Sequence, residues 1–271
     1  MNIPGLIYLF FMHPTWFWHV IWHRILAPSN LKKRHNRRHL EYKETELSLR
    51  ETLQKTTRSG SKEIASVLAE SREIKINGVS INKSIPARFD ASKKLAQLCY
   101  SIIRLTKPSI IIETGVARGV TTSYILKALD MNRTGHLFSI ELPILMPYAW
   151  KEIGRMVPES LRQKWTLILG PGTQKMKKLR ENVASIDLFI HDSEHTYSNQ
   201  LAEYKIAMSW LRRGGILISD DVDNDALLEI SEENSGILAV INQEEKYKPK
   251  YLGILTKSDH DSNLVKHHMK E

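Results

Sequence analysis

Acidic and histidine side chains gather in two short motifs of the 271-residue sequence. The first motif is His-Asp-Ser-Glu-His at 191–195, and the second is Asp-Asp-Val-Asp-Asn at 220–224. Neither motif contains Lys or Arg, and carboxylates that meet without such a neighbour repel one another, so they need a cation. Oxygen ligands suit a hard ion such as Mg²⁺, with Ca²⁺ or Mn²⁺ as substitutes. Asp192, Asp220 and Asp221 are therefore the candidate metal ligands.

His195 follows Asp192 by three residues and is the candidate catalytic base. A histidine can take a proton from a hydroxyl near neutral pH, and such a base contributes about 10²–10⁴-fold to a rate. Two simpler interpretations compete: a histidine at a helix start can satisfy a backbone carbonyl, and aspartates often cap helices. One cap would explain one aspartate but not three at adjacent strand ends. We therefore favour the base and expect His191, Glu194 and Asp223 to support the site or face solvent.

A second candidate loop has the sequence Glu-Thr-Gly-Val-Ala-Arg-Gly at 113–119. Gly115 permits a sharp turn, and Gly119 permits the next helix to approach the strand closely. A dinucleotide-binding loop would begin with glycine, whereas Glu113 would repel a pyrophosphate and suits the ammonium of a methionine moiety. Glu141 ends the next predicted strand, where a carboxylate can accept hydrogen bonds from ribose hydroxyls. The candidate cofactor-binding residues are Glu113, Thr114, Gly115, Gly119, Glu141 and Asp192.

Alternating strands and helices position these residues. Apolar runs predict strands at 109–114, 136–142, 165–170, 186–192, 215–221, 237–242 and 251–256. Helices are expected at 90–105, 119–130, 173–183, 197–212 and 225–233. Apolar strands separated by helices indicate an α/β, Rossmann-like sheet of seven mostly parallel strands, covered by helices on both faces. Ligands bind beyond the carboxyl ends of such strands, and the acidic candidates fall there: Glu113, Glu141, Asp192, Asp220 and Asp221.

The composition is that of a globular chain with a basic N-terminal arm. Hydrophobic residues make up 42% and charged residues 25%, which supports a sizeable core. Cys99 is the single cysteine, so an intramolecular disulfide and a cysteine metal site are excluded, and a reducing, cytoplasmic location is expected. The net charge is +9, and residues 1–50 hold eight Lys and Arg against three Glu. A partner for the basic charge is therefore expected at the arm.

The arm, residues 3–27, is apolar and aromatic, and the basic run LKKRHNRRH (31–39) follows it. A cleaved signal peptide is disfavoured because no Lys or Arg precedes the apolar stretch and no small-x-small site follows it. Pro4 and Pro14 interrupt a spanning helix. The remaining interpretations are an anchor at the membrane surface, where tryptophan and basic residues are favourable, and packing on its own domain or in a homo-oligomer.

The sequence divides into four segments. Residues 1–60 form the arm and a polar helical spacer, 61–105 a helical lead-in, 106–258 the core and 259–271 a polar tail. Within the lead-in, residues 71–84 contain a short alternating run that predicts a hairpin turning at Asn77-Gly78.

Four motifs carry a resemblance to a known family. They are KPSIIIETGVARGVTTS (107–123), VPESLRQKWTLILGPG (157–172), IDLFIHDSEHTY (186–197) and LRRGGILISDDVDND (211–225). The stretch from Ile85 to about Lys257 resembles class I S-adenosylmethionine (SAM)-dependent methyltransferases. Within these it is similar to the group of macrocin-type sugar O-methyltransferases and cephalosporin-hydroxylase-like proteins.

The resemblance implies SAM as methyl donor, metal ligation by Asp192, Asp220 and Asp221, and a base at His195. The family often has Glu at its second ligand position, where this chain has the shorter Asp220. The implied function is a metal-assisted O-methyltransferase acting on a hydroxyl, such as that of a sugar or glycoconjugate. The alternatives are hydroxylase-like or N-methyltransferase chemistry on the same fold, and a non-catalytic cofactor-binding module docked through its arm. A nucleic acid partner ranks last, because the aromatic residues precede the basic run instead of alternating with it.

Overall fold

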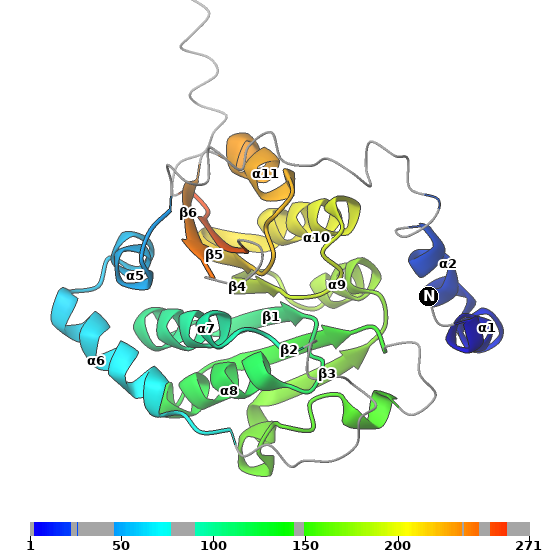
Figure 1. Cartoon of the computed structure of the whole chain (residues 1–271), viewed down its shortest axis with the longest axis horizontal. Coiled ribbons are helices and arrows are strands. Elements are labelled where there is room, and N and C mark those ends of the chain that lie inside the picture. The colour runs from blue at the N-terminus through cyan, green and yellow to red at the C-terminus, as the bar shows by residue number, and fades with distance from the viewer. Residues whose placement is uncertain are drawn as a thin grey trace, which may run out of the picture.

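The computed structural model describes residues 3–22, 26, 46–76, 90–143, 149–234, 236–243 and 250–258. A seven-stranded sheet forms its centre, in the order β3-β2-β1-β4-β5-β7-β6 (Figure 1). The strands are β1 (Ile110–Thr114), β2 (His136–Glu141), β3 (Trp165–Leu169), β4 (Ile186–His191), β5 (Leu211–Ser219), β6 (Ile237–Asn242) and β7 (Tyr251–Thr256). The first five pair in parallel, whereas β7 is antiparallel to both β5 and β6. The predicted Rossmann-like, mostly parallel sheet is thus confirmed.

Helices cover both faces of the sheet (Figure 1). One face carries α7 (Lys93–Thr106) and α8 (Val120–Asn132), and the other carries α9 (Gly172–Arg180), α10 (Tyr197–Trp210) and α11 (Ala226–Asn234). Neighbouring strand residues point to opposite faces, so that Ile111 joins the cluster under α7 and α8 while Ile112 joins the cluster under α10. Burial on both faces explains why the strands are apolar throughout.

The predicted spacer is helical, as expected, and it packs on the domain. It forms α5 (Leu49–Thr57), and the predicted lead-in begins with α6 (Ser61–Glu73); the two helices contact each other and α7. Leu53 and Ile64 are completely buried in the core cluster below α7. A capping box between Ser48 and Glu51 begins α5. The apolar residues of this segment are few, but they recur at helical spacing, so the polar composition concealed a packed pair of helices.

The expected hairpin at 71–84 is wrong in its first part, because residues 71–73 complete α6. Residues 77–89, including the proposed turn, lie outside the described residues, as does the tail from 259. Two short 3₁₀ helices, Ala149–Glu152 and Glu159–Lys164, lie between β2 and β3.

Strand β5 differs from its predicted bounds of 215–221. It begins at Leu211 and ends at Ser219, with a register shift where it pairs with Ile186 and Leu188 of β4. Asp220 and Asp221 therefore follow the strand instead of ending it. They belong to the loop after the strand, where successive side chains need not point to opposite faces of the sheet.

The N-terminal arm forms two short helices, α1 (Ile3–Met12) and α2 (Pro14–Ile21). Trp16 lies beside the end of β3, because a Cβ atom built on Gly170 would be 3.3 Å from its Cζ2 atom. Within the part of the chain that is described, each helix falls short of the length and apolar content needed to cross a bilayer. The basic run at 31–39 lies outside the described residues.

Candidate active site

The parallel strands bring the candidate residues to one edge of the sheet. Hydrogen bonding continues one residue beyond the strand ends: the Asp192 amide donates to the Thr114 carbonyl (2.8 Å), and the Asp220 amide donates to the His191 carbonyl (2.9 Å). Asp192 is thereby tied to the end of β1, and its neighbour His191 is tied to the loop after β5. The predicted meeting of these loops at the carboxyl edge is confirmed.

Glycine at position 115 is required by this packing. Gly115 has φ of +87°, and a Cβ built there would lie 1.9 Å from the carbonyl oxygen of Asp192. The Cβ of any other residue would therefore force the two loops apart. Gly119 also has positive φ (+91°), and its close approach is to Gly154 and Val157 in the β2–β3 connection.

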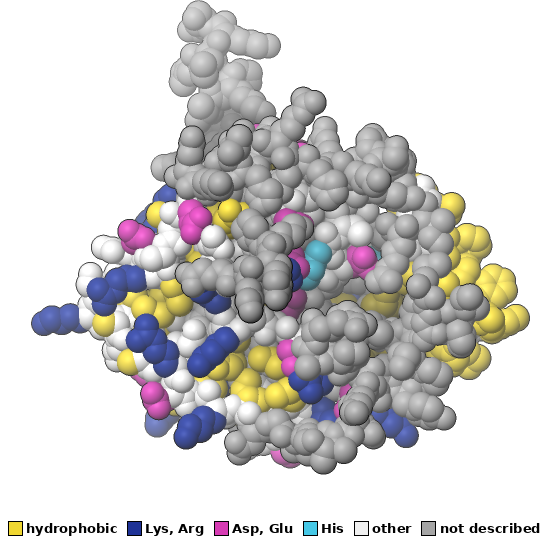
Figure 2. All heavy atoms as spheres, in the orientation of Figure 1, with side chains coloured by type: hydrophobic (Ala, Val, Ile, Leu, Met, Phe, Trp, Pro, Cys, Tyr) yellow, Lys and Arg dark blue, Asp and Glu magenta, His cyan; other side chains and the backbone are white. Residues whose placement is uncertain are grey.

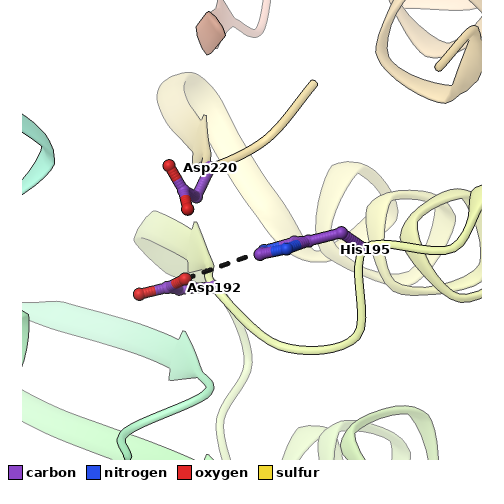
Figure 3. A group of neighbouring side chains, drawn as sticks. All are labelled: Asp192, His195 and Asp220. Carbon is purple, nitrogen blue, oxygen red and sulfur yellow. Dashed lines mark ion pairs between the residues drawn. The ribbon is translucent and has the colours of Figure 1, made fainter. Parts of the chain in front are cut away.

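Three side chains form a compact polar cluster beyond β4 and β5 (Figure 3). One ligand atom from each of Asp192, His195 and Asp220 lies within 4.8 Å of the others. His195 Nε2 is 3.7 Å from Asp192 Oδ1, and His195 Nδ1 is 3.4 Å from Asp221 Oδ2. This cluster contains two of the three predicted ligands. The third, Asp221, lies on the other side of the imidazole ring and is outside the group.

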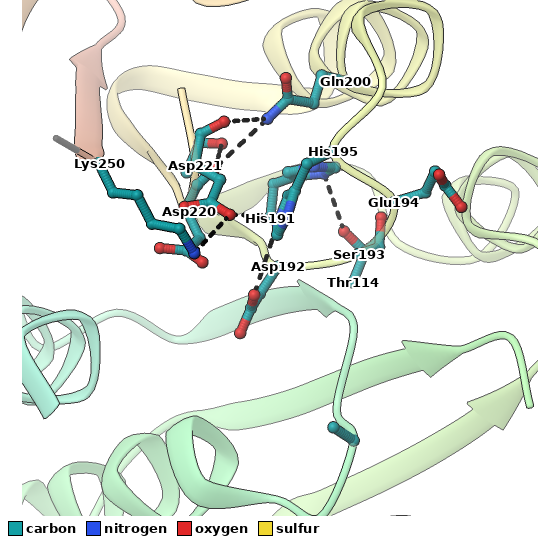
Figure 4. Close-up of polar contacts among 12 residues, drawn as sticks. Thr114, His191, Asp192, Ser193, Glu194, His195, Gln200, Asp220, Asp221 and Lys250 are labelled. Carbon is teal, nitrogen blue, oxygen red and sulfur yellow. Dashed lines mark hydrogen bonds and ion pairs between the residues drawn. The ribbon is translucent and has the colours of Figure 1, made fainter. Parts of the chain in front are cut away.

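Asp221 has a cationic neighbour, so the expectation that the carboxylates lack a nearby Lys or Arg is wrong for this residue. Lys250, the residue before β7, places its Nζ atom 3.2 Å from Asp221 Oδ2 (Figure 4). The antiparallel β7 runs beside β5 and carries Lys250 back to the carboxyl edge. Asp221 Oδ1 is buried and has no hydrogen-bond partner among the described residues. Asp221 is thus partly neutralised, and it retains one oxygen that could accept a ligand.

The negative charge of the cluster shifts the ionisation of its members. Burial raises the pKa of Asp192 to about 7, with further upward contributions from Asp220 and Asp221 that the contact with His195 opposes. Burial lowers the pKa of His195, but Asp192, Asp220 and Asp221 outweigh it and raise that pKa to about 9. Burial also raises the pKa of Asp220. A positive charge would stabilise the ionised carboxylates, and in the unliganded cluster the imidazolium supplies it.

A buried network below the cluster joins the loops after β1 and β4. Glu203 of α10 accepts hydrogen bonds from Thr114 Oγ1 (2.6 Å) and Ser193 Oγ (3.2 Å), and it pairs with His191 Nδ1 (2.8 Å). Burial raises the pKa of Glu203, but these hydrogen bonds outweigh it and hold the pKa below its ordinary value. Glu203 could not be predicted as a site residue, because the sequence shows one acidic residue within a helix and its burial is seen only in the structure.

The two glutamates assigned to the cofactor make contacts within the chain itself. Glu113 is completely buried and accepts hydrogen bonds from Ser139 Oγ (2.6 Å) and Thr122 Oγ1 (2.9 Å); burial raises its pKa to about 8. Glu141 Oε2 accepts the backbone N–H groups of residues 116 (2.5 Å) and 117 (2.9 Å), and burial raises its pKa. Glu141 therefore shapes the loop after β1. Direct contact of either carboxylate with a cofactor stays a prediction.

Two further polar residues near the motifs have structural contacts. Arg118 pairs with Asp90, at 2.8 Å from its Nε atom, which ties the 113–119 loop to the residues before α7. Tyr197 is buried and donates a hydrogen bond to Glu229 of α11.

Part of the chain is similar to a known family of domains. Residues 112–222, about two fifths of the chain, match the family model described as a methyltransferase domain. This match includes the loop after β1 and the whole Asp192–His195–Asp220 cluster. No curated protein shows significant sequence similarity to the chain. The family match and the sheet order make this part of the chain similar to methyltransferase domains.

Solved O-methyltransferase structures share the fold. An O-methyltransferase from Klebsiella pneumoniae is 17% identical, with a TM-score of 0.53 over 80% of this chain and 99% of that one. An O-methyltransferase from Bacillus cereus, in complex with S-adenosylhomocysteine (SAH), is 15% identical, and its TM-score is 0.52 over 79% of this chain and 99% of that one. The O-methyltransferase TomG from Streptomyces achromogenes is involved in tomaymycin synthesis, and its structure contains SAM. It is 14% identical, with a TM-score of 0.54 over 80% of this chain and 99% of that one.

Proposed function

We propose that this chain is a metal-assisted O-methyltransferase that transfers a methyl group from SAM to a hydroxyl of an acceptor. The observation that carries the proposal is the cluster of Asp192, His195 and Asp220, whose ligand atoms lie within 4.8 Å of one another. The cluster stands directly beside the glycine loop of a methyltransferase domain, so a methyl donor and an acceptor hydroxyl could meet there.

The loop after β1 fits the methionine and ribose parts of SAM. Gly115 keeps the backbone of this loop against residue 192, and Glu141 fixes the loop through two backbone N–H groups. Bound SAM would supply a sulfonium methyl group that is open to in-line displacement. The proposed binding loop is completed by Thr114 and Gly119. Glu113 is buried at the start of this loop, where it accepts hydrogen bonds from Ser139 and Thr122.

Asp192 and Asp220 fit a divalent cation. Their carboxylates are hard oxygen donors, and burial raises the pKa of each, as expected where negative charge lacks compensation. The free Oδ1 atom of Asp221 is the nearest candidate for a third protein ligand. A bound cation would lower the pKa of an acceptor hydroxyl and orient it.

His195 is placed to accept the proton of that hydroxyl. A proton on Nδ1 would face Asp221 Oδ2 at 3.4 Å, which leaves Nε2 as an acceptor on the side of Asp192. The high pKa of His195 arises from the surrounding carboxylates. A cation bound to those carboxylates would lower the pKa of His195, because their negative charge would no longer stabilise the imidazolium as strongly. The ring could then act as a base.

The acceptor class rests on the family resemblance. The resemblance to macrocin-type enzymes points to a sugar hydroxyl, and the three solved relatives are described as O-methyltransferases. We therefore propose a hydroxylated glycoside or glycoconjugate as the substrate class.

The test separates cofactor binding, metal binding and turnover. Release of SAH is measured with a panel of hydroxylated glycosides, with and without chelator, for the wild type and for His195→Gln. The proposal predicts turnover that needs a divalent cation, together with a loss of at least about a hundredfold in His195→Gln. SAM affinity should be unchanged and Mn²⁺ affinity should not fall, because the variant removes a positive charge beside the carboxylates. Undiminished turnover after metal removal would refute metal assistance. Loss of Mn²⁺ affinity in His195→Gln would show that His195 is a ligand and refute its role as base.

A further inference from the structure

The two helices of the arm expose a large apolar surface. Figure 2 shows hydrophobic side chains gathered over α1 and α2, at the right edge of the molecule. Phe11 is 73% exposed and Trp18 is 55% exposed. The other exposed large apolar side chains of these helices and the residues that follow are Ile7, Tyr8, Phe10, Met12, Trp22 and Leu26. Contiguous apolar surface of this kind marks a site of interaction.

Aromatic contacts hold the two helices together as one unit. Phe10 of α1 packs against Phe17 of α2 with ring centroids 5.1 Å apart, and His13 stacks on Trp16 at 4.1 Å. Trp16 lies against Gly170 at the end of β3. The arm thus contacts the carboxyl edge of the sheet, the edge that also carries the Asp192 cluster, while Phe11 and Trp18 remain exposed.

The charge of the arm specifies the kind of partner. Residues 3–22 contain no Lys, Arg, Asp or Glu, and the first 40 residues contain six Lys and Arg but no acidic residue. Tryptophan and tyrosine favour the headgroup level of a bilayer, and nearby basic residues are attracted to anionic lipids. Association of two copies is disfavoured by like-charge repulsion, because each chain has a net charge of +9.

We propose that α1 and α2 dock the protein on the surface of an anionic membrane, with the carboxyl edge of the sheet close to the lipid. The helices are 10 and 8 residues long and separated at His13, so they suit insertion into the headgroup region, whereas crossing a bilayer takes about 20 residues. The docking is independent of the methyl-transfer chemistry. It would give the active site access to a lipid-linked or membrane-embedded acceptor.

Sedimentation of the full chain with vesicles tests the docking surface. The vesicles are phosphatidylcholine alone, or phosphatidylcholine with about one quarter phosphatidylglycerol. The test variant is Phe11→Ser/Trp18→Ser. The matched control is Trp150→Ser, which removes a tryptophan that is 54% exposed outside the arm. Size-exclusion chromatography with light scattering measures the oligomeric state of each protein without vesicles.

We expect the wild type and Trp150→Ser to bind anionic vesicles and to release them at about 0.5 M salt, where the Debye length is only a few ångströms. The double variant should partition at least about tenfold less. Equal partitioning of the double variant and the wild type would overturn the proposal. So would a wild-type dimer that the double variant dissociates, since a second copy would then cover the surface.

Discussion

Replacement of Glu113 by glutamine is expected to change how the stability of the protein depends on pH. The carboxylate is completely buried, and burial raises its pKa from 4.5 to about 8. Because the folded-state pKa is the higher one, the folded chain binds the proton more tightly than the unfolded chain does. The stability contributed by the neutral carboxyl is therefore complete below pH 4.5 and is lost as the pH rises through about 8.

The magnitude follows from the size of this shift. Each pKa unit corresponds to about 1.4 kcal/mol, so the stability contributed by the neutral carboxyl falls by about 3 kcal/mol by pH 7, where Glu113 is ionised in the unfolded chain but mostly neutral in the folded one. The loss reaches about 4 to 5 kcal/mol above pH 8. Glutamine has nearly the same shape and keeps a carbonyl oxygen that can accept from Ser139 and Thr122. The variant stays neutral at every pH, so its stability relative to the wild type should rise by several kcal/mol between pH 5 and pH 8.5.

Urea unfolding of both proteins across this pH range is the assay. Other groups titrate in the same range, Asp192 among them, but the difference between wild type and variant isolates the contribution of residue 113. Glu159→Gln is the control, because that side chain is 93% exposed and its change in stability should be independent of pH. A constant difference between the wild type and Glu113→Gln would refute the reasoning, as would a variant that loses stability relative to the wild type when the pH rises.

Two further substitutions test the packing and charge of the site. Gly115→Ala places a Cβ 1.9 Å from the Asp192 carbonyl oxygen and should lower the free energy of unfolding by at least about 2 kcal/mol. The control is Gly60→Ala, whose new Cβ has nothing within 4 Å, and it should lower the free energy of unfolding by less than about 1 kcal/mol. Similar losses in thermal unfolding would contradict the steric argument. Lys250→Met removes the cation that pairs with Asp221, so Mn²⁺ affinity measured by calorimetry should rise about threefold or more; an unchanged or weaker affinity would show that Asp221 takes no part in binding.

Much of the site could be predicted from the sequence because a parallel sheet imposes its geometry. Apolar strands followed by acidic residues place those residues at one edge, and the meeting of Asp192 with Asp220 follows from the pairing of β4 with β5. Single buried contacts could not be predicted in this way. Lys250 reaches Asp221 only because β7 is antiparallel, and Glu203 lies inside a helix whose spacing gives no sign of the His191 pair.

The extent of the folded domain was harder to predict for a related reason. The segment before residue 77 is polar on average, and composition favoured a spacer over packed helices. A few apolar positions of its two helices, such as Leu53 of α5 and Ile64 of α6, are nevertheless completely buried. Helical spacing of sparse apolar residues is thus a better guide here than mean polarity.

Binding of Mn²⁺ tests the central claim most directly, because it needs neither acceptor nor turnover. Electron paramagnetic resonance titration counts the bound ions in the wild type, in Asp192→Asn and in the control Asp130→Asn. Asp130 is a half-buried aspartate on α8 whose side chain pairs with Lys127. The account predicts one site in the wild type and in Asp130→Asn, weakened at least about tenfold in Asp192→Asn. Absence of a site in the wild type, or equal binding by Asp192→Asn, would contradict it.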